Sequence, residues 1–319
     1  LHSAMPGADG VIEPTADHYA EIGATQSAAL SPDGIALLND VIGRKAPSTI
    51  GDTPMIESLS ATVDGLMALA DQTLAADAPL PDLEALHELG LRTLAMEDLE
   101  LFYQLVADSP DQEAIDSVDK LRDLAEEAAR VNALGRLRDY AAGDSEVLPT
   151  ATDYQLNSVE FDEPFWIDAF NDALAVQSVT LDTDDTQAAL DLDAITTGYA
   201  AILSDDIEPE AEDFAAIGAA EAHALMDDAE NQPEASALFM AALSETEAAD
   251  LVQVSRVDEL AAAAARLVES ILATAPWAQP TVPPEDFDHL GMPGVSEFNL
   301  GAIVQQLHNP EPDSETAPD

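Results

Sequence analysis

Glu84 and His87 are the best candidates for metal ligands in this sequence. Residues three positions apart share one face of a helix, so both side chains could bind the same ion. Helical di-iron sites combine two Glu-x-x-His units with two further Glu residues, and no second such unit accompanies this one. The pair is a weak metal candidate, and a histidine on an acidic surface is the simpler interpretation.

Half of the ten Lys and Arg residues lie between residues 120 and 138 of one predicted helix. They are Lys120, Arg122, Arg130, Arg136 and Arg138. Arg side chains bind carboxylates through two parallel hydrogen bonds. The cluster therefore predicts a docking surface for an acidic part of another subunit or domain. The alternative, which the sequence favours, is pairing with acids of the same chain, as the i,i+4 pairs Asp116–Lys120 and Glu126–Arg130 suggest.

Several kinds of chemistry lack the residues that they need. The chain has no Cys, which excludes disulfides, thiolate metal sites and Cys nucleophiles. It contains no P-loop, G-x-G-x-x-G, H-E-x-x-H or G-x-S-x-G string. Binding to nucleic-acid phosphates requires basic patches, and a net charge of −54 argues against them. We expect no cofactor and no nucleic-acid partner, and we identify no catalytic residue.

The acidity of the chain has its own explanation. Asp and Glu number 64 against ten Lys and Arg, and they are spread along the predicted helices rather than gathered in blocks. Charge of one sign repels itself and destabilises a compact state, but molar salt shortens the screening length to about 3 Å. The composition resembles that of proteins from salt-in halophiles. It predicts a surface that binds hydrated cations.

The elements that carry these residues are predicted to be helices. Ser31-Pro32, Thr53-Pro54 and Ser109-Pro110 are helix-start signals. Apolar residues at steps of three and four predict long helices over 56–74, 83–106 and 115–137. We expect a mainly α fold of antiparallel helical bundles or hairpins, with an irregular or β-containing middle segment and a Pro/Gly-rich C-terminal strap.

The predicted organisation has five parts. An N-terminal arm covers residues 1–15 and a helical domain covers 16–145. A crossover with short strands is expected over 146–185, a second helical region over 186–275, and a strap with a polar tail over 276–319. No apolar run reaches about 18 residues, so we expect no membrane span.

Weak internal echoes suggest that the two helical regions are related. Residues 16–24 resemble residues 211–219, and the pattern Val-Asp-x-Leu occurs at 63–66, 118–121 and 257–260. A chain so rich in Ala, Asp and Glu also produces such matches by chance, so this relation is a hypothesis.

Two classes of function fit these observations. The first is a non-catalytic structural or assembly protein, a subunit of a larger complex or a virion, with protein partners or self-association. The alternative is a helical enzyme that binds a metal or a small ligand at a site not visible as a motif. The composition favours the high-salt cytoplasm of a halophile, or a virion assembled there, and leaves secretion open.

Overall fold

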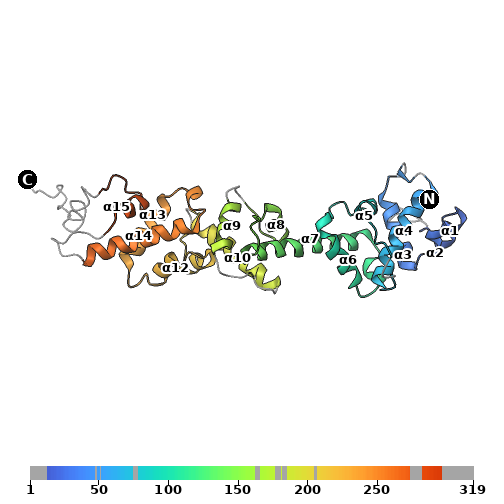
Figure 1. The fold of residues 1–319 in the computed structure, drawn as a ribbon, viewed down its shortest axis with the longest axis horizontal. Coiled ribbons are helices and arrows are strands. Elements are labelled where there is room, and N and C mark those ends of the chain that lie inside the picture. The colour runs from blue at the N-terminus through green and yellow to red at the C-terminus, as the bar shows by residue number, and fades with distance from the viewer. Residues whose placement is uncertain are drawn as a thin grey trace, which may run out of the picture. The chain divides into compact units, whose positions relative to one another are not determined.

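The chain is helical throughout its described part. The computed structural model describes residues 13–46, 49–50, 52–74, 78–161, 166–176, 181, 185–204, 207–273 and 282–296. Within these ranges the chain forms fifteen α-helices and no strand (Figure 1). The all-α prediction is confirmed. The chain divides into two compact units, Leu1–Ala133 and Leu134–Asp319, each with its own hydrophobic core.

The first unit contains six helices and the beginning of a seventh. They are α1 (Ala16–Glu21), α2 (Thr25–Ala29), α3 (Pro32–Arg44), α4 (Thr53–Ala70), α5 (Leu83–Leu89), α6 (Leu99–Ala107) and α7 (Val118–Ala141). Pro32 opens α3 after the Ser31 side chain, which accepts a hydrogen bond from the Gly34 backbone. Helix α7 runs from the first unit into the second: Leu121 and Ala125 belong to the first core, and Leu137 belongs to the second.

The described residues of the second unit form the remaining helices. They are α8 (Ala151–Leu156), α9 (Trp166–Val176), α10 (Asp185–Ile202), α11 (Ala211–Ile217), α12 (Ala220–Asp227), α13 (Pro233–Glu245), α14 (Val254–Ala273) and α15 (Pro284–His289). The predicted short strands over 146–185 are wrong for the described part of that segment, which holds α8 and α9. Tyr154 on α8 and Phe170 on α9 are buried, and their ring centroids lie 5.5 Å apart.

One predicted helix is broken by a residue with positive φ. The expected long helix over 83–106 ends at Gly90, whose φ is 108°, and resumes as α6. Helix α1 likewise ends just before Gly23, whose φ is 80°. Left-handed backbone ends a helix, and glycine adopts it without steric cost. The predicted arrangement in bundles or hairpins stays a prediction. The arm over 1–12, residues 276–281 of the strap and the tail after 296 lie outside the described residues.

One arrangement of helices recurs four times along the chain. A short helix is followed by a turn, a middle helix and a long helix, in residues 14–70, 81–141, 149–202 and 209–273. The first and last of these ranges have one further helix after the turn, α2 and α12. We call these repeats 1 to 4. The short helices are α1, α5, α8 and α11, the middle ones α3, α6, α9 and α13, and the long ones α4, α7, α10 and α14. Helix α15 has the form of a fifth short helix. In three places the long helix of a repeat contacts the short helix that follows it: α4 contacts α5, α10 contacts α11 and α14 contacts α15.

The turn after each short helix has the same hydrogen bonds. The residue at the turn has positive φ in all five cases: Gly23, Gly90, Ser158, Gly218 and Gly291. The next backbone N–H donates to the carbonyl five residues earlier, at distances from 2.8 to 3.1 Å. These donor–acceptor pairs are Ala24–Tyr19, Leu91–Leu86, Val159–Tyr154, Ala219–Phe214 and Met292–Phe287. This is the Schellman arrangement, which satisfies carbonyls at the helix end. The acceptor side chains are all buried in the cores.

A carboxylate joins consecutive repeats in the same way in both units. In the first unit, Oδ2 of Asp40 on α3 accepts a hydrogen bond of 2.8 Å from the Val118 backbone at the start of α7. In the second unit, Oδ2 of Asp172 on α9 accepts one of 2.7 Å from the Val254 backbone at the start of α14. Acidic groups stabilise helix N-termini by satisfying unpaired N–H groups. The middle helix of one repeat thus caps the long helix of the next.

Candidate functional site

The structure assigns a local role to the candidate ligand His87. Its Nε2 lies 3.0 Å from the Leu94 carbonyl oxygen, so the ring braces the turn that follows α5. Glu84 is exposed in the first turn of the same helix. No group of three His, Asp or Glu side chains with metal-binding geometry occurs among the described residues. A metal site at Glu84 and His87 therefore stays a prediction.

The predicted docking cations in the first half of α7 pair with acids close by in sequence. Nζ of Lys120 lies 2.9 Å from Oδ1 of Asp116, the predicted i,i+4 partner. Arg122 lies 2.9 Å from Asp119. Arg130 binds Glu127 through two hydrogen bonds of 2.8 and 2.7 Å. These pairs are partly exposed, and exposed ion pairs typically contribute less than about 1 kcal/mol.

The two cations near the end of α7 bind acids from other helices of the second unit. Arg136 lies 2.6 Å from Asp153 on α8, and Arg138 lies 2.9 Å from Asp185 at the start of α10. The Asp153 side chain is 5% exposed. Burial pushes its pKa up, but hydrogen bonds from Thr150 and Arg136 outweigh burial and hold the pKa below its usual value. These pairs connect helices within the unit.

The structure therefore places all five predicted docking residues in contact with acids of the same chain. Intramolecular pairing accounts for their positions, and docking to a partner stays a prediction. Sequence reasoning missed the carboxylates Asp40 and Asp172, which join the repeats. A signal for them existed, because each follows an Asn in the middle of its repeat.

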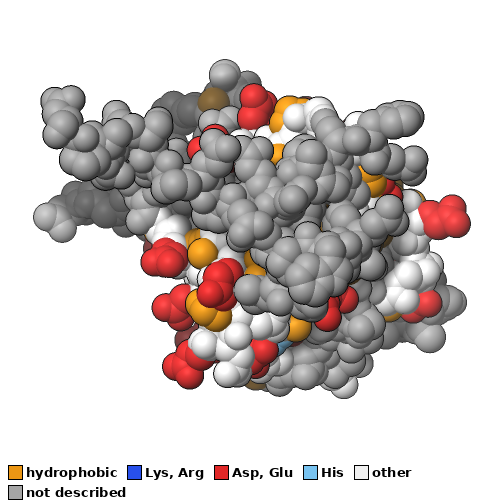
Figure 2. All heavy atoms as spheres, turned by 90° about the vertical axis from the view of Figure 1, so that its left-hand side faces the viewer, with side chains coloured by type: hydrophobic (Ala, Val, Ile, Leu, Met, Phe, Trp, Pro, Cys, Tyr) orange, Lys and Arg blue, Asp and Glu red, His pale blue; other side chains and the backbone are white. Residues whose placement is uncertain are grey.

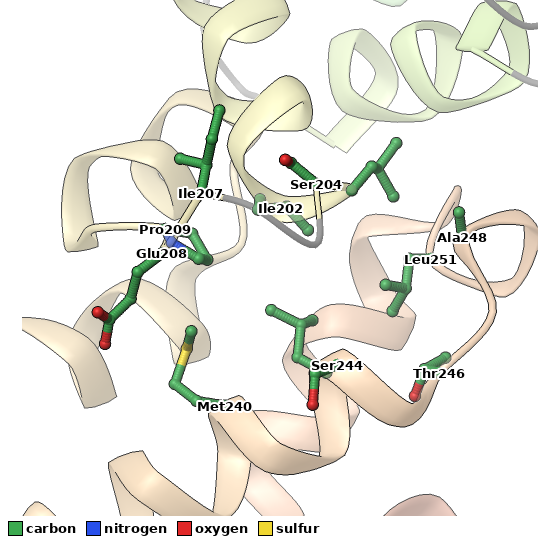
Figure 3. Close-up of a pocket in the computed structure, with 12 residues that line it drawn as sticks. Ile202, Ser204, Ile207, Glu208, Pro209, Met240, Ser244, Thr246, Ala248 and Leu251 are labelled. Atoms are coloured by element: carbon green, nitrogen blue, oxygen red, sulfur yellow. The ribbon is translucent and has the colours of Figure 1, made fainter.

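The second unit contains a hollow of about 370 Å³ beside the end of α10 (Figure 3). Apolar side chains of α10, α13 and the segment after α13 form most of its wall. The main contributors are Ile202, Leu203, Met240, Leu243 and Leu251. Ser204, Ser244 and Thr246 also line it, and the hydroxyls of Ser244 and Thr246 donate to backbone carbonyls of α13. A concave apolar wall with a few polar groups is the usual form of a small-molecule site.

Comparisons with known proteins do not assign this chain to a family. No protein-family model, curated protein or solved structure matches it. None of the described helices is both long enough and apolar enough to cross a membrane.

Proposed function

We propose that this chain is a non-catalytic structural or assembly protein that works in molar salt. One observation carries the proposal: a single helical arrangement occurs four times, and the same carboxylate contact joins its copies in both units. Proteins built from tandem repeats use their stacked units to present extended binding surfaces. Such a chain is suited to hold partners, or further copies of itself, in a larger complex.

The distribution of charge supports the salt part of the proposal. Acidic side chains are scattered over the described residues on the face shown in Figure 2. The net charge is −54, and the few cations are used in pairs such as Arg136–Asp153 and Arg266–Asp286. A surface of this kind keeps a protein apart from other acidic surfaces at low salt. In molar salt, screening removes that barrier and permits assembly.

Light scattering of the purified chain in molar NaCl, with metal analysis of the same sample, tests the function. We expect particles larger than one chain and no stoichiometric metal. A compact monomer that carries one metal per chain would contradict the proposal and favour the enzyme alternative.

A matched pair of variants tests the docking surface on α7. Arg122→Gln and Arg256→Gln each remove one cation that pairs with an acid three residues away. We expect smaller particles for Arg122→Gln and unchanged particles for Arg256→Gln. Equal particle sizes in both variants would place the assembly surface elsewhere.

A further inference from the structure

The hollow in the second unit lies where the first unit has side-chain bridges. Helices α4 and α10 both contain 18 residues and occupy the same place in repeats 1 and 3. Helix α4 contacts α6, the middle helix of the next repeat, and the end of α10 lines the hollow together with α13, the middle helix of the next repeat in the second unit. Buried Phe102 and Phe239 mark equivalent positions on these middle helices, as do buried Ile115 and Leu251 just before the next long helices. The two places can therefore be compared residue by residue.

In the first unit, two side chains close this place. The Tyr103 hydroxyl donates a hydrogen bond to the Pro81 carbonyl. Nε2 of Gln112 donates to Oδ2 of Asp71 at 2.6 Å and to the Met67 carbonyl at 3.4 Å. A phenol ring and an amide thus connect α6 and the residues after it to the end of α4.

In the second unit, the equivalent positions carry side chains that cannot make these bonds. Met240 stands where Tyr103 stands, Ala248 where Gln112 stands and Leu203 where Asp71 stands. All three line the hollow, together with Pro209, the equivalent of Pro81 (Figure 3). A thioether offers no proton, so Met240 leaves the Pro209 carbonyl without the donor that the first unit supplies.

The same loss distinguishes repeat 4 from the other three repeats. Nδ2 of Asn39 donates to the Pro14 carbonyl at 2.8 Å, and Nδ2 of Asn171 donates to the Pro149 carbonyl at 3.3 Å. Tyr103 does the same in repeat 2. Repeat 4 alone has an apolar residue, Met240, at this position. The hollow therefore lies in repeat 4, the repeat whose residue at this position cannot donate the hydrogen bond to the proline carbonyl that the other three repeats make.

We propose that this hollow is a binding site for an uncharged phenol. The second unit has Met240 and Ala248 in place of Tyr103 and Gln112. A phenol would supply the groups that are then missing, which are an aromatic ring against the apolar wall and a hydroxyl that donates to a backbone carbonyl. Its volume of about 370 Å³ lies within the range of small-molecule sites. Glu208 also lines the hollow, and at contact distance its carboxylate opposes an anion even in molar salt, so the ligand is neutral rather than a carboxylate.

Calorimetric titration of the full chain in molar NaCl with 4-ethylphenol tests the proposal. We expect saturable binding at one site. The analogue 4-ethylanisole has the same ring but no donor, and it should bind about fivefold more weakly, as the loss of one neutral hydrogen bond implies. The anion 4-hydroxybenzoate should bind more weakly still. The absence of 4-ethylphenol binding, or equal binding of all three, would overturn the proposal.

Variants that fill the hollow locate the site. Met240→Tyr with Ala248→Gln restores the side chains of the first unit, and it should weaken 4-ethylphenol binding at least about tenfold. The control is Met96→Tyr with Ala61→Gln, the same substitutions at exposed positions, which should bind like wild type. Ala248→Gln alone, a smaller change, should also weaken binding. Wild-type affinity in both filled variants would show that the phenol binds elsewhere.

Discussion

At the scale of single residues, buried tyrosines donate hydrogen bonds to asparagines of the middle helix in two repeats. The Tyr19 hydroxyl donates to Oδ1 of Asn39 at 2.6 Å, and the Asn39 amide donates to the Pro14 carbonyl. Tyr154 and Asn171 repeat the pair at 2.7 Å. A buried hydroxyl or amide without a partner costs free energy. The pair therefore fixes the middle helix against the start of the short helix without leaving a polar group unsatisfied.

Because these tyrosines are buried, we predict that the folded chain becomes less stable at high pH. Burial raises the pKa of Tyr19 to about 12, and it raises that of Tyr103 to about 12. In the unfolded chain tyrosine ionises at about pH 10. Between pH 10 and pH 12 the unfolded state binds fewer protons than the folded state. The free energy of unfolding is therefore unaffected by these tyrosines below pH 10 and decreases between pH 10 and pH 12.

Tyr19→Phe removes one of these groups and should reduce the decrease in stability. The measurement is urea unfolding in molar NaCl, which screens the carboxylates, at a series of pH values. Tyr140→Phe is the control, because Tyr140 is only partly buried and should contribute less. If the Tyr19→Phe profile matches wild type, burial of this hydroxyl does not control the alkaline transition.

At the scale of the elements, the turn after each short helix depends on a left-handed residue. Gly23 has φ 80°, and an added Cβ would meet no atom within 4 Å. Gly23→Ala therefore tests backbone strain alone, and it should destabilise the chain by about 1 kcal/mol. Gly135 lies inside α7 with equally open surroundings. Gly135→Ala should stabilise by up to about 1 kcal/mol, because alanine favours helices.

Thermal unfolding in molar NaCl measures both substitutions. The opposite signs are the essential result, because the two variants add the same methyl group in open space. A stabilising Gly23→Ala would mean that the turn does not need its left-handed conformation.

Two of the three helix starts were predictable from the sequence because they depend on local chemistry. Helix α3 begins at Pro32 and α4 at Thr53, as the Ser-Pro and Thr-Pro signals indicate. The Ser109-Pro110 signal is instead followed by a short 3-10 helix, Gln112–Ile115, with Asp111 as its N-cap. The break at Gly90 was not predictable, because apolar spacing continues through it and Leu91 beyond the turn is as buried as Leu86 before it. The spacing of apolar residues indicates which residues are buried, and this spacing continues across a turn when the residues before and after the turn face the same core.

The hollow was not predictable from the sequence either. Its wall includes Leu203 and Met240, which are far apart in the chain and look like ordinary core residues. What distinguishes them is their difference from Asp71 and Tyr103, and that difference becomes visible only when the repeats are matched by their turns. The strands expected over 146–185 were not found in its described part, where Tyr154 and Phe170 are buried on α8 and α9.

At the scale of the whole molecule, charge of one sign is spread over both units. The net charge is −54, whereas the buried cores contain almost only apolar side chains. Buried acids such as Asp153 and Asp286 are paired with Arg136 and Arg266. Repulsion among the remaining carboxylates therefore acts on the folded surface and weakens as the screening length shortens.

This balance predicts that the chain unfolds when salt is removed. At about 10 mM NaCl the screening length is about 30 Å, so the carboxylates of a unit repel one another across it. Circular dichroism during dialysis from molar NaCl should show a loss of helix that returns when salt is restored. Matched dialysis into molar KCl should preserve the helices, because screening depends on ionic strength rather than on the cation. An unchanged spectrum at low salt would mean that the cores outweigh the repulsion and that the acidity is not an adaptation to salt.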